Sequence, residues 1–335
     1  MPARRTAAIV FVHGLARKPP PAQLQEIWLW GLGRDNPMPG VFAPPNKGLQ
    51  LADEGIVSRL NYYADVFYGA GYETDTRSYY EGNEDFEIAS EALDRVEPDL
   101  PTPTPQTPRE RAFIAGFQAK LAAQMALLPS VAPALPPQGT LDGTALEIAS
   151  WLPDPVKQAV IRKAALEAYY FLFDKEYTRP DGERFRVREQ LRARLLADLH
   201  AAREQADTTV IISHSMGTMV AYDVLRNCPD CPPVATLFTM GSPLGIQEVQ
   251  DELKAEGTRQ VDFPAAKLGR WINLYDPLDP VCGASPRLGE DYLPVDGHAV
   301  QDLKESNWGH WRHTVTHYLA GSLLRSHLRQ AAGLD

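Results

Sequence analysis

The sequence is poor in cysteine and lacks any long apolar run, and both absences restrict the class of protein. Three of the 335 residues are cysteines, an odd number that cannot build a complete disulfide framework, so a reducing compartment is expected. No stretch approaches the ~20 apolar residues that a membrane-spanning helix requires. We therefore expect a cytoplasmic protein with no stable membrane insertion.

The first residues imitate a secretory signal peptide without reaching its length. Arg4 and Arg5 precede an apolar run that extends from Ala7 to Val12 before His13 interrupts it. The apolar region of a signal peptide has ~7–15 residues, and no small-residue cleavage site follows here. This segment is therefore interpreted as a β-strand.

Positive charge is also scarce. The chain has 33 Lys and Arg against 43 Asp and Glu, a net charge of −10, so nucleic-acid phosphates and anionic membranes are not expected partners. The stretch 184–196 is rich in arginine, but Val187, Leu191 and Leu195 recur every four residues within it. This spacing predicts an amphipathic helix with its arginines on the solvated side.

The cysteines do not indicate a redox or metal site. Cys228 and Cys231 have the spacing of a redox motif, but they follow a helical pattern and precede a strand, outside any thioredoxin-like context. A metal would need more ligands than Cys282 can add. We interpret the thiols as structural or incidental and expect no metal and no organic cofactor.

The hydrophobic content of 44% is ample for a globular core, and its distribution indicates an α/β fold. Short runs of branched apolar residues, bounded by turn residues, are typical of strands buried on both faces of a parallel sheet. They occur at 6–13, 208–213, 234–240 and 270–275, and 62–69 is a further expected strand. Helical patterns lie between several of them, as in βαβ units.

The middle of the chain interrupts this alternation. Residues 97–110 hold five prolines and predict an extended linker. Two helical faces follow, each with apolar residues three or four apart. We therefore assign 98–180 to an inserted helical cap and 1–97 with 181–335 to the core. The faces consist of Phe113, Phe117, Leu121, Met125 and Leu128, and of Ile161, Ala165, Ala168 and Leu172.

The stretch VIISHSMGTMVAYDVL, residues 210–225, passes from a strand pattern to a helical pattern around Ser215. A nucleophile elbow has this order, with a strained nucleophile and small residues two positions before and after it. Ser213 and Gly217 fill these positions, although the familiar pattern has glycine at the first. Free N–H groups at the helix start favour developing negative charge, so the N–H of Met216 is an expected oxyanion donor. A plain strand-to-helix turn is the alternative.

A serine nucleophile needs a histidine to take its proton and an acid to orient that histidine. The chain offers both after Ser215. The stretch WINLYDPLDPV, residues 271–281, places Asp276 and Asp279 just after a strand pattern. The stretch ESNWGHWRHTVTHYL, residues 305–319, then brings His310, His313 and His317.

These motifs together resemble the α/β-hydrolase superfamily, and most closely its bacterial lipase- and esterase-like serine hydrolases. The similar stretches are IVFVHGL, SHSMGTMVAYDVL, TMGSPLG, NLYDPLDPV and a histidine five residues before YL, in the superfamily order Ser, Asp, His. They cover the first 15 residues and most of 208–319 but say little about 98–180. The resemblance implies an α/β-hydrolase fold, a mostly parallel doubly wound sheet with an inserted helical cap.

The resemblance also implies roles for individual residues. Ser215 matches the nucleophile. Asp279, just before Pro280, matches the acid better than Asp276, which sits at the strand end and shapes the turn. His313 matches the base through its spacing to Tyr318 and Leu319, with His310 as its rival; a metal site on His310, His313 and His317 is the alternative use of these side chains.

The end of the first strand, His13-Gly14-Leu15, matches the segment that supplies a second oxyanion donor. The N–H of Leu15 is the expected donor, and Gly14 allows close approach. His13 is interpreted as a residue that fixes this loop. Ser242, in the stretch GSPLG, lacks the elbow spacing and is interpreted as structural.

The expected function is hydrolysis of a small-molecule carboxylic ester, of small or medium acyl length, through a Ser-His-Asp triad and an acyl-enzyme. Two alternatives remain open. The same triad serves an acyltransferase, a thioesterase or an amidase, and a hydrolase fold can also be a binding protein without catalysis. The oligomeric state does not follow from the sequence.

Overall fold

The structure is a computed structural model that describes residues 5–14, 17–69, 104–128, 154–179, 181–254, 257–308 and 311–334. Within these residues, no helix combines the length and the apolar character needed to cross a membrane.

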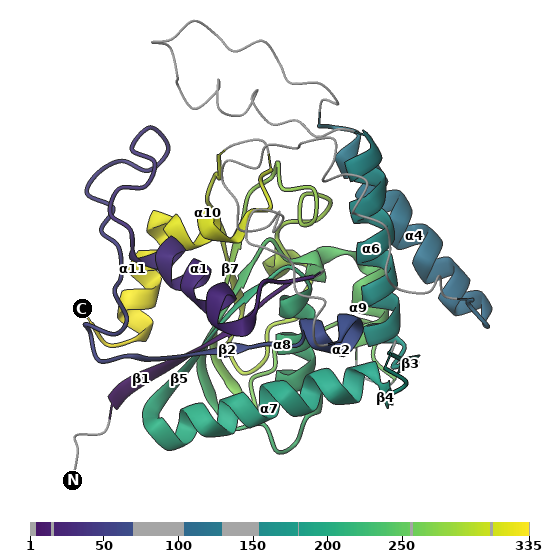
Figure 1. Cartoon of the computed structure of the whole chain (residues 1–335), viewed down its shortest axis with the longest axis horizontal. Coiled ribbons are helices and arrows are strands. Elements are labelled where there is room, and N and C mark those ends of the chain that lie inside the picture. Colours follow the sequence, from purple (N-terminus) through teal and green to yellow (C-terminus); the bar gives the residue numbers. More distant parts are fainter. Residues whose placement is uncertain are drawn as a thin grey trace, which may run out of the picture.

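A six-stranded sheet forms the centre of the molecule, and every neighbouring pair of strands in it is parallel (Figure 1). The strands expected at 6–13, 208–213, 234–240 and 270–275 are all present, so these predictions are confirmed. In sheet order the strands are β2 (Val57–Asn61), β1 (Arg5–Val12), β5 (Ala206–His214), β6 (Val234–Met240), β7 (Leu268–Tyr275) and β8 (Val300–Lys304).

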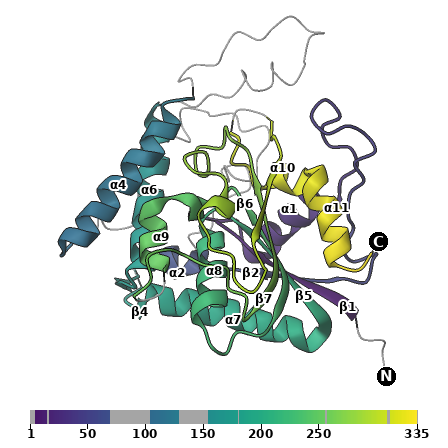
Figure 2. The same ribbon diagram turned by 180° about the vertical axis from the view of Figure 1, so that it is seen from behind.

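Helices cover both faces of this sheet, as Figures 1 and 2 show from opposite sides. Along β1, Ala7, Ile9 and Phe11 join the core under one helical layer, whereas Ala8 and Val10 join the core under the other. Strands buried on both faces are typical of a doubly wound α/β sheet. The first layer consists of α1 (Pro21–Gly33), α10 (Val315–Ala320) and α11 (Ser322–Ala331), and the second includes α7 (Val187–Gln205), α8 (Met216–Asn227) and α9 (Gln247–Leu253).

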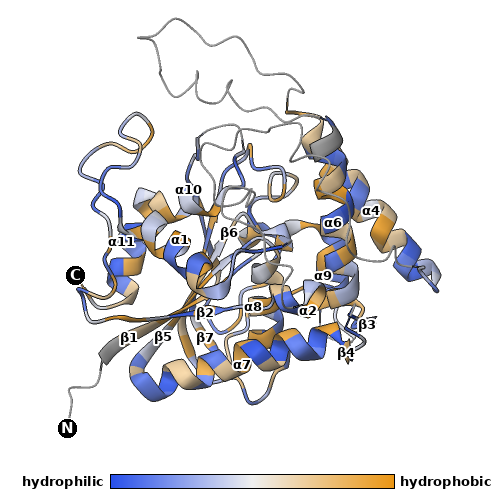
Figure 3. Ribbon diagram, in the orientation of Figure 1, coloured by the Kyte–Doolittle hydropathy of each residue, from blue (hydrophilic) through white to orange (hydrophobic). Residues whose placement is uncertain are grey.

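Helix α7 has the predicted apolar face, because Val187, Leu191 and Leu195 are fully buried, and it carries hydrophilic residues between them (Figure 3). The expectation that its arginines all face solvent is wrong. Arg188 and Arg192 both hydrogen-bond the buried carboxylate of Asp223 on α8. Periodicity separates the apolar stripe of a helix from its other faces, but it does not say which neighbouring helix covers those faces.

This ion network predicts a large loss of stability when its centre is removed. Asp223→Ala leaves Arg188 and Arg192 with side chains that are only 15% and 28% exposed and no carboxylate, so we expect unfolding free energy to fall by about 3 kcal/mol. Urea denaturation measures this change. Asp262→Ala is the matched control: its pair with Arg226 is 28% exposed on each side and should contribute less than about 1 kcal/mol.

The same network gives a pH dependence of known sign. Burial raises the pKa of Asp223, but hydrogen bonds from Arg192 and Arg188 and the charges of both outweigh burial and hold this pKa below its ordinary value of 3.8. The stabilisation is therefore complete above pH 3.8 and is lost as the pH falls through the folded-state pKa. Asp223→Ala should accordingly flatten the acid side of the stability curve.

The prediction of a strand at 62–69 is wrong. Residues Ala64–Tyr68 form the short helix α2, and the strand of this region is β2, which ends at Asn61. Ala64, Val66, Phe67 and Tyr68 are all buried. A run this short and this rich in apolar residues has no clear period that distinguishes a strand from a helix.

The region expected to be a cap is described in part, as α4 (Pro108–Met125), α6 (Asp154–Leu172) and strand β3 (Glu176–Thr178). Residues 98–103, 129–153 and 180 lie outside the described residues. Both predicted apolar faces are buried, and they belong to the same core cluster as α7 and α8. Strand β3 pairs with β4 (Arg184–Arg186), so one hairpin spans the expected boundary at 180. The division into core and cap stays a prediction.

The extended linker expected at 97–110 does not continue to residue 110. Helix α4 starts at Pro108, inside the stretch 97–110, and Thr107 caps it by accepting the N–H of Glu110 at 3.2 Å. Proline is favourable in the first turn of a helix because its missing N–H would have no intrahelical acceptor there. Ion pairs of α4 with α9, Lys120 to Glu248 at 2.8 Å and Arg109 to Glu252 at 2.7 Å, hold the helix against the core.

Candidate active site

The strand order reverses between β1 and β5, which are parallel neighbours whose carboxyl ends lie side by side. From β1 the chain adds β2 on one side, and the later strands β5, β6, β7 and β8 add on the other side. Ligands of open α/β sheets bind where the strand order reverses in this way. His13 directly follows β1, and Ser215 directly follows β5.

Ser215 forms a strained turn between β5 and α8. Its backbone has φ 55° and ψ −132°, a left-handed conformation that is unfavourable for any residue other than glycine. Its N–H donates to the carbonyl of Met240 at 3.0 Å, which fixes the turn against β6. The side chain is fully buried, and its Oγ makes no hydrogen bond to any described residue.

The two residues expected to be small have separate structural reasons. A Cβ on Gly217 would lie 2.4 Å from the carbonyl oxygen of His13 and 2.5 Å from that of Val12, so α8 starts in backbone contact with the end of β1. Ser213 replaces glycine without an unsatisfied hydroxyl, because its Oγ donates to the carbonyl of Phe238 at 2.9 Å. The N–H of Met216 lies in the first turn of α8, where backbone N–H groups have no intrahelical acceptor.

The structure brings together Asp279 and His313, which are 34 residues apart in the chain. The Nδ1 atom of His313 lies 2.8 Å from Asp279 Oδ2 and 3.0 Å from Oδ1, and both side chains are buried. Asp279 Oδ2 also accepts the hydroxyl of Tyr318 at 2.7 Å, and Oδ1 accepts the N–H of Val281 at 2.8 Å. The carboxylate therefore orients the imidazole with its Nδ1 toward the acid.

These contacts keep Asp279 ionised. Burial raises the pKa of Asp279, but the charge of His313 and the hydrogen bonds from His313, Tyr318 and Val281 outweigh burial and place this pKa below its ordinary value. An acid that stays ionised is the electrostatic partner that a developing imidazolium requires.

Asp276 has a different environment. Its Oδ1 accepts the N–H of Leu278 at 2.8 Å, its Oδ2 accepts the N–H of Asn307 at 2.7 Å, and Arg312 lies 3.7 Å away. Burial raises its pKa, and the charge of Arg312 offsets this only in part. Asp276 thus joins the turn that carries Asp279 to the loop before His313.

One backbone segment contacts both Ser215 and the His–Asp pair. Met240 accepts the N–H of Ser215, and the next residue, Gly241, has φ 54°. A Cβ on Gly241 would lie 2.7 Å from Asp279 Oδ2 and 2.9 Å from His313 Nδ1, so glycine is required on both grounds. The hydrogen bond from Ser215 Oγ to His313 is not formed in this structure, and such bonds often tighten when substrate binds.

His214 lies directly before Ser215 and packs against the candidate base. Its ring is 4.4 Å from the ring of His313, centroid to centroid, at an interplanar angle of 32°. Burial lowers the pKa of His214 well below its ordinary value, and the positive charges of His313 and Lys18 lower it further. His214 is therefore neutral at physiological pH.

The loop after β1 is fixed by His13, as expected from the sequence. His13 Nδ1 bonds the carbonyl of Gly14 at 2.8 Å, and its Nε2 accepts the N–H of Tyr63 at 3.0 Å. The Tyr63 ring stacks on the His13 ring at 4.0 Å, and its hydroxyl donates to the carbonyl of His13. Both imidazole nitrogens are thus used in structure. Leu15, the other expected oxyanion donor, lies outside the described residues.

Ser242 has a structural environment too. Its Oγ accepts the N–H of Leu244 at 3.2 Å and bonds the hydroxyl of Thr218 at 2.8 Å. Thr218 in turn donates to the carbonyl of Ser215 at 2.6 Å. Ser242 therefore contacts the turn at Ser215 indirectly, through Thr218.

The two described histidines of the last motif, His313 and His317, do not converge. His313 faces Asp279, whereas His317 on α10 stacks on Trp308 at 3.8 Å between ring centroids. His310, the rival base, lies outside the described residues. The helical arrangement that a shared metal site would need is not present for His313 and His317, because α10 begins at Val315.

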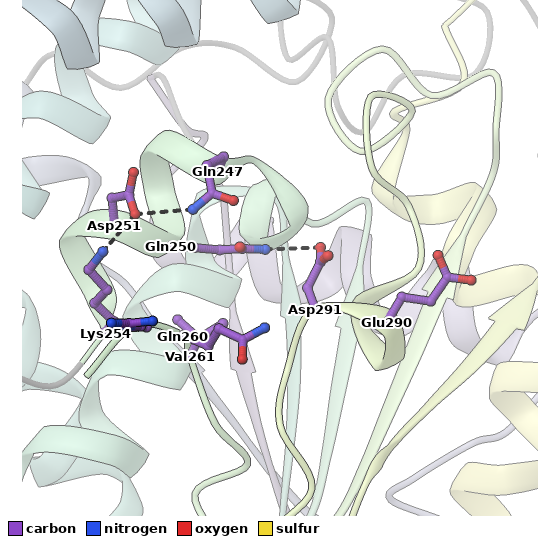
Figure 4. Close-up of a pocket in the computed structure, with 9 residues that line it drawn as sticks. Gln247, Gln250, Asp251, Lys254, Gln260, Val261, Glu290 and Asp291 are labelled. Atoms are coloured by element: carbon purple, nitrogen blue, oxygen red, sulfur yellow. Dashed lines mark hydrogen bonds and ion pairs between the residues drawn. The ribbon is translucent and has the colours of Figure 1, made fainter.

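A polar pocket lies beside α9 (Figure 4). Within it Asp251 accepts from Gln247 and Lys254, and Gln250 donates to Asp291 at 3.0 Å. These side chains satisfy one another, and no serine or histidine is among them. The residues that line the pocket are Gln247, Gln250, Asp251, Lys254, Arg259, Gln260, Val261, Glu290 and Asp291.

Two residues of the site were not assigned a role from the sequence, namely Gly241 and Tyr318. Gly241 follows a strand in the stretch TMGSPLG, and a glycine directly after a buried strand is the signal of close backbone approach. Tyr318 enters the sequence pattern only through its spacing from His313.

No family model matches the chain, and a comparison with curated proteins finds none similar to it.

Proposed function

We propose that this protein is a serine hydrolase of the α/β-hydrolase type, which cleaves a carboxylic ester through an acyl-enzyme. One observation carries the proposal. Ser215 sits in a strained left-handed turn at the start of α8, and the segment Met240–Gly241 that holds it also contacts a buried His313–Asp279 pair. Strain at a buried serine beside such a pair is typical of an activated nucleophile.

In the proposed reaction Ser215 Oγ attacks the ester carbonyl carbon, and its proton passes to His313 Nε2. The Nδ1–H of His313 remains bonded to Asp279, which stabilises the imidazolium. The tetrahedral intermediate then expels the alcohol, which takes the proton from His313 Nε2. Water attacks the acyl-serine by the same route and releases the acid.

The negative charge on the carbonyl oxygen is stabilised by backbone N–H groups. Met216 supplies one from the first turn of α8, and the second is proposed from Leu15. Met216 is held in place because α8 starts in contact with the end of β1 at Gly217. Such fixed donors stabilise an oxyanion without reorganising during the reaction.

Active-site labelling tests this proposal. The native chain is treated with a neutral fluorophosphonate probe, and the adduct is detected by intact mass and located by peptide mapping. We expect one adduct per chain on Ser215, because an unactivated serine hydroxyl does not react at a comparable rate. Chain denatured before treatment is the control and should carry no adduct.

The alternatives give other results. Adducts on other serines, or none on the native chain, contradict the proposal and favour a hydrolase-fold binding protein. If Ser215 is labelled, a series of p-nitrophenyl esters and thioesters of increasing acyl length identifies the acyl group. Adding alcohols to that assay distinguishes hydrolysis from acyl transfer by the ester formed.

A further inference from the structure

The carboxylate of Asp279 is shared by two side-chain donors at a single oxygen. Asp279 Oδ2 lies 2.7 Å from the hydroxyl of Tyr318 and 2.8 Å from Nδ1 of His313. Tyr318 comes from α10 and is 1% exposed, so its ring holds the hydroxyl in this position. The charge of one carboxylate oxygen is therefore divided between a phenol and an imidazole.

The direction of the phenol hydrogen bond is defined. The Tyr318 oxygen accepts the N–H of Asp276 at 3.3 Å, so its own proton is available for Asp279. Burial raises the pKa of Tyr318 well above its ordinary value, and the negative charge of Asp279 raises it further. The phenol therefore remains protonated and donates.

We propose that Tyr318 is a positioning residue of the triad, whose hydroxyl draws charge from Asp279 and thereby lowers the basicity of His313. A carboxylate that receives a second strong donor is a weaker acceptor for the first. With the phenol present, the imidazolium is held less tightly and His313 releases its proton more readily. This inference rests on the proposed serine-hydrolase function, since it concerns the basicity of the proposed base.

Other titratable groups surround Tyr318 and His313. The ring of His214 lies 4.4 Å from that of His313 and 5.8 Å from that of Tyr318. Cys282 Sγ lies 3.9 Å from the Tyr318 hydroxyl. Replacing Tyr318 by phenylalanine leaves all of these groups in place and removes one oxygen atom. The charged and titratable groups around Tyr318 and His313 are Asp279, Asp276, Arg312, His214 and Cys282, and Lys18 and His13 act electrostatically on His214.

The test is the pH dependence of Ser215 labelling by the neutral fluorophosphonate, in native chain and in Tyr318→Phe. We expect the plateau rate constant to fall about tenfold, because the carboxylate loses a charge-assisted hydrogen bond that orients it. We also expect the acidic midpoint to move up by about half to one pH unit, because His313 becomes more basic. Loss of packing alone lowers the rate without moving the midpoint.

A matched control removes a buried phenol elsewhere. The hydroxyl of Tyr222 donates to the carbonyl of Asp262 at 2.9 Å, and Tyr222→Phe should leave both rate and midpoint unchanged. A second variant is expected to move the midpoint in the opposite direction. Incorporation of 3-fluorotyrosine at position 318 makes the phenol a stronger donor and should move the midpoint to lower pH, without loss of ring volume.

The outcomes separate this inference from the function that it rests on. Absence of labelling in the native chain overturns the proposed function itself. With labelling present, an unchanged or lower midpoint in folded Tyr318→Phe overturns the role of Tyr318. If Tyr318→Phe does not fold, as judged by circular dichroism, the fluorotyrosine chain decides, and an unchanged or higher midpoint overturns the proposal.

Discussion

Ser215→Ala is expected to abolish turnover and to make the protein more stable. Removing the nucleophile of a serine triad lowers kcat by about 10⁵- to 10⁶-fold, because the histidine and acid have no hydroxyl to activate. The stability gain has a separate origin. Ser215 Oγ is buried and makes no hydrogen bond to a described residue, so its removal should stabilise the fold by about 1 kcal/mol.

Ser215→Gly extends the same prediction to the backbone. Glycine adopts φ 55° without the steric cost that any other residue incurs, a relief of about 1–3 kcal/mol. The greater freedom of glycine in the unfolded chain offsets up to about 1 kcal/mol of this gain. The glycine variant should therefore be at least as stable as the alanine variant, and equally inactive.

Urea denaturation and ester turnover measure the two halves of this prediction. Ser326→Ala is the control, because this serine is exposed on α11; both its turnover and its unfolding free energy should stay within normal error of the native values. A Ser215→Ala protein that keeps its turnover contradicts the nucleophile assignment. A Ser215→Ala protein that is clearly less stable than the native protein contradicts the interpretation that the buried hydroxyl of Ser215 costs stability.

The sequence identifies those strands of this fold that are buried on both faces. The strands β1, β5, β6 and β7 are recognisable because both their faces are covered, which leaves a continuous apolar run between turn residues. Segment 62–69 is similarly rich in apolar residues, yet Ala64–Tyr68 within it form a helix, and the N–H of the preceding Tyr63 bonds the ring of His13. That contact joins residues 50 apart and has no local signal.

The same limit applies to the site. The strand-turn-helix pattern indicates the place of Ser215, and parallel strands indicate that the residues after β5 and β7 share one edge of the sheet. The contact of Tyr318 with Asp279 joins residues 39 apart, and the pairing of Arg192 with Asp223 depends on which helix lies beside α7. Patterns along one element do not contain such contacts, which arise when elements pack together.

Asp279→Asn is expected to lower kcat by about 10⁴-fold with little change in fold, whereas Asp276→Asn should stay within about tenfold of native. The carboxylate of Asp279 accepts from His313, Tyr318 and Val281, and an amide has one oxygen and a donor in place of two acceptors. Its neutral side chain also fails to stabilise the imidazolium. The histidine then loses both its orientation and the partner of its charge.

The comparison with Asp276 is informative because the two acids are three residues apart and both buried. Burial raises the pKa of Asp276, whereas the pKa of Asp279 lies below its ordinary value, so the surroundings stabilise the charge of Asp276 less than that of Asp279. We expect Asp276→Asn to lower the unfolding free energy by about 1–3 kcal/mol, since its oxygens accept the N–H groups of Leu278 and Asn307.

Steady-state kinetics on a common ester, together with urea denaturation of each variant, tests the pair. Equal losses of kcat in both variants would mean that the two acids act as one hydrogen-bonded unit rather than in separate roles. A larger loss in Asp276→Asn would transfer the acid role to Asp276. Because the pKa of Asp279 lies below its ordinary value, protonation of this acid cannot produce a midpoint near neutral pH.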